Sequence, residues 1–223
     1  MKTFEQSINV RLVGVTKPVV DFIESSQDLI SYQARVSNPD NQENFETATG
    51  LLKYCARHGH WSIFQMADAV MEIEAPRDIS RQILRHQSFD FQEFSQRYSA
   101  VTDDMFCIRE ARLQDNKNRQ NSLETDDEAL QQWWEETQQG VLENIQMAYN
   151  IALRKGIAKE CARVILPEGN TMSRMYMKGS MRSWIHYCNL RKGNGTQKEH
   201  AVLIPKITEE LHKHFPDVID MLD

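Results

Sequence analysis

Residues 81–98 read RQILRHQSFDFQEFSQRY. The first six residues continue a helix that Pro76 opens, since proline is well tolerated in a first helical turn, and we expect this helix to extend through His86. From Phe89 onward aromatic residues alternate with polar ones, which is typical of a strand with one dry and one wet face. The segment Ala69–Ala75 also alternates and is predicted to be a strand. The centre of the chain therefore predicts a strand, a short helix and a second strand.

The remaining patterns predict a helix-rich α+β fold with a modest sheet. No internal repeat and no linker rich in Pro, Gly or Ser divides the chain, so we expect a single domain covering residues 1–223. The further expected elements are a strand over 10–20 with a turn at 17–18, helices over 27–36, 43–57, 127–155, 157–165, 180–190 and 197–215, and an exposed loop over 114–128. The expected buried side of the longest helix consists of Trp133, Trp134, Val141, Ile145, Ala148 and Ala152.

The composition is ordinary for a soluble globular protein, and the net charge is −6. This charge argues against a long nucleic acid as the main partner, although a small anion can bind where arginines are concentrated. We expect no membrane partner, because the sequence lacks an apolar run of about 18 residues and a signal-peptide core. The expected location is the cytoplasm, or the host cytoplasm for a viral protein.

The cysteine and histidine spacings predict no metal site. The four cysteines form no C-x-x-C pair, which favours reduced thiols. His58-Gly59-His60 is the one dense histidine spacing, and it lacks the nearby carboxylate or Cys ligands that a metal site needs.

Three arginines, Arg77, Arg81 and Arg85, recur at four-residue spacing on one face of the predicted helix. Like charges at this spacing cost a helix about 0.2–0.5 kcal/mol per pair, so the stripe, with Arg97 beyond it, indicates an anion that offsets the repulsion. A guanidinium group matches two phosphate oxygens at once. The alternative is a solvated basic face, which is the commoner origin of an arginine stripe.

Other polar groups and aromatic rings accompany these arginines. Amides can read the imide edge of a pyrimidine, and aromatic rings can stack on a flat ring. For the aromatic residues, the alternative is packing into the core. The polar residues are Gln82, Gln87, Gln92, Glu93 and Ser95, and the aromatic ones are Phe89, Phe91, Phe94 and Tyr98.

The segment also resembles the signature of the flavin-dependent thymidylate synthases, which is R-H-R followed by seven residues and a serine. It stands here as Arg85-His86-Gln87, SFDFQEF and Ser95. Three further blocks resemble those of the family: HGHWSIF from His58, ECARVILP from Glu160 and RSWIHYCNLR from Arg182. The four blocks follow the family's order and cover most of the chain, in the form seen in large-virus and phage members. The resemblance implies a single α+β domain with a mostly antiparallel sheet.

The resemblance assigns site residues by position. It places dUMP against Gln82, Arg85, Glu93, Ser95, Gln96, Arg97, Arg163 and Arg191. It places the flavin against Ser62, Arg85, His86, Gln87, Glu93, Ser180, Arg182 and His186. Arg191, Ser95 and His60 are the implied catalytic residues. Arg191 would favour the ionised pyrimidine, Ser95 would position groups or handle a proton, and His60 would lie beside flavin and folate. For Ser95, a hydroxyl that satisfies a strand end is the alternative.

The implied reaction converts dUMP to dTMP, with methylenetetrahydrofolate as carbon donor and NADPH-reduced FAD as hydride donor. The family also implies a homotetramer with active sites shared between subunits. A classical thymidylate synthase attacks the pyrimidine with an activated cysteine. None of the cysteines here has the flanking Pro and His that such a nucleophile would want, which is consistent with a flavin route.

Two positions depart from the family pattern. Gln87 stands where the family has Arg, and Gln65 stands where a Glu often follows the residue equivalent to Phe64. These losses are either a compensated exchange or a mark of changed specificity. We favour compensation, because removing one partner of an ion pair leaves the other charge uncompensated. The alternative functions are a sister enzyme that hydroxymethylates or methylates dUMP or dCMP, and a non-catalytic nucleotide or flavin binder.

Overall fold

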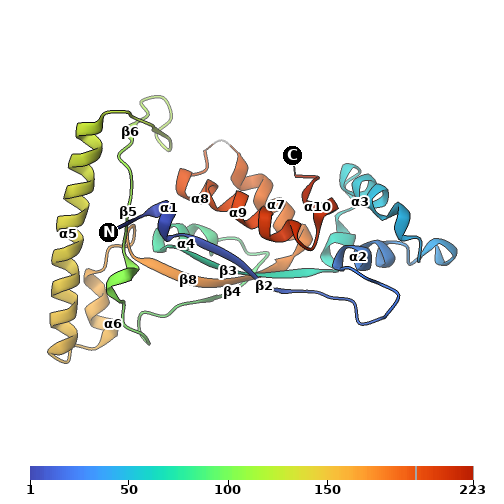
Figure 1. The fold of residues 1–223 in the computed structure, drawn as a ribbon, viewed down its shortest axis with the longest axis horizontal. Coiled ribbons are helices and arrows are strands. Elements are labelled where there is room, and N and C mark those ends of the chain that lie inside the picture. The colour runs from blue at the N-terminus through green and yellow to red at the C-terminus, as the bar shows by residue number, and fades with distance from the viewer. Residues whose placement is uncertain (194, 223) are drawn as a thin grey trace. The chain divides into compact units, whose positions relative to one another are not determined.

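The computed structural model describes residues 1–193 and 195–222, apart from the side chain of Asp103 (Figure 1). Its contacts divide the chain into two units. Unit 1 consists of Met1–Asn9, Glu74–Arg85 and Gln92–Met175, and unit 2 consists of Val10–Ile73, His86–Phe91 and Tyr176–Asp223. One boundary falls between Arg85 and His86, inside the signature stretch. The expectation of a single domain stays a prediction.

The main sheet has four strands in the order β2-β3-β8-β4. They are β2 (Asn9–Val15), β3 (Asp68–Pro76), β8 (Met172–Ser180) and β4 (Asp90–Glu93). The backbone N–H groups of Thr16, Met181 and Phe94 donate to Asp68, Ala67 and Arg174, respectively. Each bond joins the end of one strand to the region where its neighbour begins, so adjacent strands run antiparallel. The predicted helix-rich α+β class with a modest, mostly antiparallel sheet is confirmed.

Strand β8 was not predicted. Its side chains alternate between buried and exposed, with Met175 and Met177 in the core. Methionine takes the place of the β-branched residues that usually mark a strand, so residue propensity carried little signal. Gly179 is required on this strand, because a side-chain carbon there would overlap the ring of Phe89.

Unit 1 contains the long helix α5 (Glu128–Arg154), which packs against β5 (Cys107–Ile108) and α6 (Lys159–Ala162) (Figure 1). The Asp127 side chain accepts a hydrogen bond from the Leu130 amide and caps the start of α5. Gly156, with a φ of +82°, follows its end. These bounds confirm the predicted helix. The other elements of unit 1 are β1 (Lys2–Thr3), α1 (Phe4–Ser7), α4 (Arg77–Ile83), η4 (Asp103–Met105), β6 (Leu113–Gln114), β7 (Ser122–Leu123) and η5 (Arg163–Ile165).

The predicted buried face of α5 is wrong in part. Trp133 and Val141 are 58% and 53% exposed, whereas Gln138 and Leu142 are buried. Gln138 can be buried because its side-chain amide exchanges hydrogen bonds with the backbone of Arg109. Helix α5 carries two apolar stripes, and their spacing alone does not show which one faces the core.

In unit 2, α7 (Met181–Lys192) and α10 (Pro216–Ile219) each pack against α9 (Leu203–His212) (Figure 1). The fully buried Trp184 of α7 donates its indole N–H to the Ala69 carbonyl at 3.2 Å, which ties α7 to β3. The other elements of unit 2 are α2 (Ser26–Ala34), η1 (Pro39–Asn41), η2 (Phe45–Thr47), α3 (Ala48–Arg57), η3 (Trp61–Gln65) and α8 (Lys198–Ala201).

Several predicted elements differ from the structure, among them the expected helix over 157–165, which is α6 followed by η5. The helix that Pro76 precedes ends at Ile83, so Arg85 lies in a turn from which the chain enters β4. Strands β6 and β7 pair as a hairpin that includes much of the expected loop. The expected C-terminal helix is interrupted at Val202 between α8 and α9. In the described part of the chain, no helix is long and apolar enough to cross a membrane.

Candidate active site

Two arginines of α4 are neutralised within unit 1. Nη2 of Arg81 lies 2.8 Å and 2.6 Å from the two carboxylate oxygens of Glu93. Nε of Arg77 lies 3.3 Å from Glu168, and Nε of Arg81 lies 3.5 Å from the same carboxylate. Carboxylates of the chain itself therefore offset the repulsion along the stripe, and no bound anion is needed for that purpose.

Glu93 is held from three directions in unit 1. Its side chain is 16% exposed at the end of β4. Besides Arg81, the Ser173 hydroxyl donates to Oε1 at 3.0 Å, and Nη1 of Arg77 lies 3.8 Å away. Two cations and a hydroxyl thus fix the orientation of this carboxylate.

A cavity of about 780 Å³ lies beside other predicted nucleotide residues of unit 1. Ser95 and Arg97 line it, and so do Lys159 and Glu160 of α6. Nε of Arg97 lies 3.3 Å from Glu160, and the Lys159 ammonium donates to the backbone carbonyl of Tyr98 at 2.8 Å. A hydroxyl, two cations and one carboxylate therefore surround a space large enough for a small ligand. The other lining residues are Tyr98, Leu153, Gly156, Ile157 and Ala158.

The remaining nucleotide residues of unit 1 lie outside this lining. Gln82 is half-buried in the last turn of α4, and Arg85 is exposed in the turn that follows. Arg163 is half-buried at the start of η5, three residues beyond Glu160. Gln96 is buried, and its Nε2 has no hydrogen-bond partner among the described residues.

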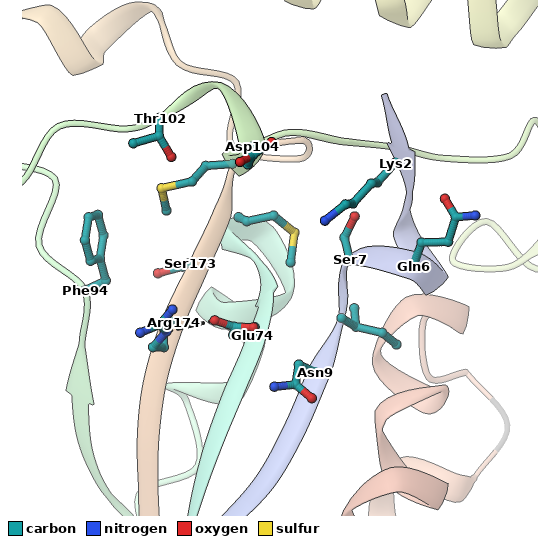
Figure 2. Close-up of a pocket in the computed structure, with 13 residues that line it drawn as sticks. Lys2, Gln6, Ser7, Asn9, Glu74, Phe94, Thr102, Asp104, Ser173 and Arg174 are labelled. Carbon is teal, nitrogen blue, oxygen red and sulfur yellow. Dashed lines mark hydrogen bonds and ion pairs between the residues drawn. The ribbon is translucent and has the colours of Figure 1, made fainter.

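A second cavity of unit 1, of about 590 Å³, was not predicted (Figure 2). Lys2 and Ser7 approach it from the N-terminal segment, and Phe94 lies on the opposite side (Figure 2). The ion pair between Arg174 and Glu74, at 2.8 Å, lies between them. Sequence patterns gave no signal for this cavity, because four separate segments supply its lining.

Several predicted flavin residues lie around η3 and α7 in unit 2. The rings of Trp61 and His186 are 4.7 Å apart at an interplanar angle of 62°. Arg182 lies one helical turn before His186, and Ser62 is exposed next to Trp61. Burial, together with the charge of Arg182, lowers the pKa of His186. The neutral imidazole is therefore favoured at neutral pH.

His60 and Ser180 have separate local roles in unit 2. Gly59, with a φ of +73°, turns the chain before His60, which is exposed. The Ser180 hydroxyl caps α7 by accepting a hydrogen bond from the Ser183 amide at 3.3 Å.

His58 contacts the Tyr54 carbonyl through Nδ1 at 2.8 Å. Across the described residues, no group of three or more His, Cys, Asp and Glu side chains could hold a metal ion. Gln65 and Gln87 are both exposed.

His86 and Arg191 meet in unit 2, although they are far apart in the sequence. Nε and Nη2 of Arg191 lie 3.1 Å and 2.8 Å from Nε2 of His86. A guanidinium group has no acceptor, so Nε2 must accept and His86 must be neutral with its proton on Nδ1. The edge-to-face contact between His86 and Tyr187 has a centroid distance of 4.8 Å.

Tyr187 and His200 adjoin the predicted site residue His86, and the sequence analysis missed both. The Tyr187 hydroxyl lies 2.8 Å from Nε2 of His200, and both side chains are buried. Burial, with the charge of Arg191, lowers the pKa of His200 to about 3. Burial also raises the pKa of Tyr187. Tyr187 could have been found from its four-residue spacing to Arg191, whereas His200 lies in another helix and had no such signal.

The cysteines of the described chain give little support for thiol catalysis. Three are buried, and Cys161 is exposed on α6. Burial raises the pKa of Cys188 to about 12, and burial also raises the pKa of Cys55. A thiol that stays protonated is a poor nucleophile.

Sequence comparison connects this chain to a known family. The family model described as thymidylate synthase complementing protein matches residues 18–217. A probable flavin-dependent thymidylate synthase of Paramecium bursaria Chlorella virus 1 is 51% identical over 216 residues, which are 97% of this chain and 99% of that protein. This chain belongs to the flavin-dependent thymidylate synthase family.

Other members and a related fold agree with this assignment. The flavin-dependent thymidylate synthase of Synechocystis sp. is 51% identical over 219 residues, which are 97% of this chain and 100% of that protein. The UMP/dUMP methylase PolB from Streptomyces cacaoi, solved with bound 5-Br dUMP, matches with a TM-score of 0.80 at 24% identity, over 96% of this chain and 93% of that one. The match to PolB concerns the fold alone. The family expected from the four sequence blocks is confirmed.

Proposed function

We propose that this chain is a thymidylate synthase that converts dUMP to dTMP. FAD is the flavin, methylenetetrahydrofolate donates the carbon, and NADPH reduces the flavin. The observation that carries the proposal is the cavity in unit 1 that Ser95 and Arg97 line. Both residues belong to the signature stretch from which the nucleotide site was predicted. Membership of the flavin-dependent thymidylate synthase family supplies the class of reaction.

The cavity offers the groups that a nucleoside monophosphate requires. The Arg97 side chain is 68% exposed, and its ion pair with Glu160 is a surface contact worth about 0–1 kcal/mol. A phosphate can therefore replace Glu160 as the partner of Arg97 at little cost. Arg163 would add a second guanidinium, and Ser95 would orient the nucleotide through its hydroxyl. The fixed carboxylate of Glu93 would accept a hydrogen bond from the imide N–H of the base.

The chemistry of the unit 2 residues fits a flavin. Ser62, Arg182 and His186 offer a hydroxyl, a cation and a neutral imidazole close to the Trp61 ring. Such groups can hold a diphosphate and the polar edge of a flavin. When bound, the reduced flavin supplies a hydride. The protein's own task is to bind and orient its ligands and to stabilise charge.

Arg191 and His60 carry the remaining proposed roles. As a fixed cation, Arg191 would favour the anionic form of the uracil ring. His60, exposed after the turn at Gly59, would contact folate. Ser180, Arg85 and Gln87 would complete the flavin contacts assigned by the family signature.

We also infer a cytoplasmic homotetramer with shared sites. Its support is the exposed apolar stripe of α5, which includes Trp133, Val141 and Met147 and which another copy of the chain could cover. Sedimentation should show a tetramer for the wild type and smaller species for Val141→Glu. The control Gln132→Glu adds a charge at an exposed position outside this stripe and should stay tetrameric. A monomeric wild type would refute the inference.

The decisive assay incubates the protein with dUMP, methylenetetrahydrofolate, FAD and NADPH and identifies the nucleotide by mass. The expected product is dTMP. A hydroxymethylated nucleotide, or a product formed only from dCMP, would replace the proposal with the sister reaction. Flavin binding without turnover would identify a non-catalytic binder. Equilibrium dialysis that detects no flavin at about 100 μM FAD, well above ordinary cofactor affinities, would reject the flavin role.

A further inference from the structure

We propose that His86, supported by the buried Tyr187–His200 pair, is the positioning residue for Arg191. It would hold the guanidinium in place before the nucleotide binds. The consequence for catalysis rests on the proposed function, because that function places Arg191 against the base. The contacts that carry the proposal all lie within unit 2.

The geometry at Nε2 of His86 selects one tautomer. Two guanidinium N–H groups of Arg191 reach this single nitrogen, at 3.1 Å and 2.8 Å. Protonation of Nε2 would place two cations against each other and would remove the acceptor. The neutral imidazole with its proton on Nδ1 is therefore the form that holds Arg191.

The imidazole packs against Tyr187, one of a group of buried aromatic rings. Tyr187 meets His86 edge to face, with centroids 4.8 Å apart, and the Tyr187 hydroxyl is anchored to His200 at 2.8 Å. The ring of Phe89 lies 5.8 Å from Tyr187 and 4.8 Å from Trp184. These buried rings have little room to move. The hydrogen bond to His200 therefore fixes the position of the Tyr187 ring against His86.

Arg191 needs such support because of its place in the chain. It is half-buried in the last turn of α7, where a long side chain could otherwise adopt many rotamers. Fixing the guanidinium in advance removes an entropy cost that would otherwise arise when the substrate binds or reacts. A fixed cation also stabilises developing negative charge better than a mobile one.

Two substitutions at position 86 test whether a hydrogen-bond acceptor at the place of Nε2 positions Arg191, or whether any polar side chain there suffices. Glutamine can place its carbonyl oxygen near the position of Nε2, whereas asparagine is shorter and places its polar atoms near Nδ1. His86→Gln should therefore keep the bond to Arg191, and its kcat at saturating flavin should exceed that of His86→Asn. His86→Asn should lose the acceptor, and kcat should fall about tenfold or more, the scale of one charge-assisted hydrogen bond. Flavin affinity is titrated for both variants, so that cofactor loss is counted separately.

A second readout needs neither ligands nor turnover. In apoprotein with ¹⁵N-labelled arginine, the Nε–H proton of Arg191 should exchange slowly with solvent, and Arg191→Lys assigns its signal. The signal should remain protected in His86→Gln and should exchange rapidly in His86→Asn. Rapid exchange in the wild type, or equal protection in both variants, would overturn the proposal. A protected signal in a protein without turnover would reject the proposed function and leave the positioning role standing.

The chain offers a matched control for the tyrosine. Tyr149 in unit 1 is also fully buried, and its hydroxyl accepts a hydrogen bond from the Val101 amide at 3.2 Å. Tyr187→Phe and Tyr149→Phe each remove one buried hydroxyl and should cost similar stability. Only Tyr187→Phe should accelerate exchange of the Arg191 Nε–H and lower kcat. The same response from both variants would mean that Tyr187 is merely structural.

Discussion

One guanidinium nitrogen of Arg81 lies 2.8 Å and 2.6 Å from the two carboxylate oxygens of Glu93, twelve residues farther along the chain. This contact joins α4 to the end of β4 and thus connects two parts of the signature stretch. Arg81 was a candidate phosphate ligand in the sequence, and in the structure it is the partner of Glu93, a carboxylate proposed to contact the substrate. The role expected of Glu93 therefore depends on Arg81.

Arg81→Gln should weaken dUMP binding about tenfold, because the Glu93 carboxylate would lose its strongest partner and its fixed orientation. The stability cost should be only about 1 kcal/mol, since the Arg81 side chain is 44% exposed and water can partly replace it. Titration with dUMP and unfolding in urea measure the two effects. Arg77→Gln is the control, because Arg77 approaches Glu93 only to 3.8 Å. Unchanged affinity in Arg81→Gln would separate Arg81 from nucleotide binding.

Arg97→Ala and Arg163→Ala should weaken dUMP binding more than FAD binding. Each arginine is proposed to contact the phosphate, and a phosphate left short of one charged partner loses a few kcal/mol, on the order of a hundredfold in affinity. Titrating both ligands against each variant measures the difference. Arg174→Ala is the control, because Arg174 lines the second cavity and pairs with Glu74. Equal losses for the two ligands would show that the pockets are assigned wrongly.

Gln65 and Gln87 should respond as a pair if they are a compensated exchange. Gln87→Arg alone should not improve turnover, because it adds a cation without its carboxylate partner. Adding Gln65→Glu should strengthen flavin binding, with a coupling of about 0.5–3 kcal/mol if the two side chains touch. Both positions are exposed, so the single changes should alter stability by less than about 0.5 kcal/mol. A double-mutant cycle on flavin affinity, with product masses for every variant, decides between the accounts. Changed products would indicate altered specificity, and strict additivity with unchanged products would leave Gln87 as a tolerated substitution.

His200 should make the protein sensitive to mild acid. Burial lowers the pKa of His200 from 6.5 to about 3, so the unfolded chain takes up a proton at this site before the native state does. As pH falls below about 6.5, this site should remove up to about 1.4 kcal/mol of stability per pH unit, until native His200 also titrates near pH 3. Unfolding in urea between pH 7 and pH 4 measures the slope. His200→Gln should flatten it, and an identical pH dependence in the two proteins would contradict the assignment.

Features that depend on neighbouring residues could be predicted without the structure. The bounds of α5 follow from Asp127 at its start and Gly156 after its end, because capping and a positive φ are local properties. The signature stretch and three further blocks identified the family, since a motif is a linear pattern that survives without coordinates. The arginine stripe was also visible in the sequence, but its carboxylate partners were not.

The contacts between charged and polar groups, in contrast, depend on how distant segments pack. Arg191 reaches His86 across 105 residues, and Ser173 reaches Glu93 across 80, because strands and helices from distant segments pack together. The same packing chose which stripe of α5 is buried and made a strand of the methionine-rich segment Met172–Ser180. Spacing along a chain encodes interactions within one element, whereas contacts between elements depend on how those elements are placed. Local patterns therefore indicated the candidate site residues, and long-range packing determines their hydrogen-bond and ion-pair partners.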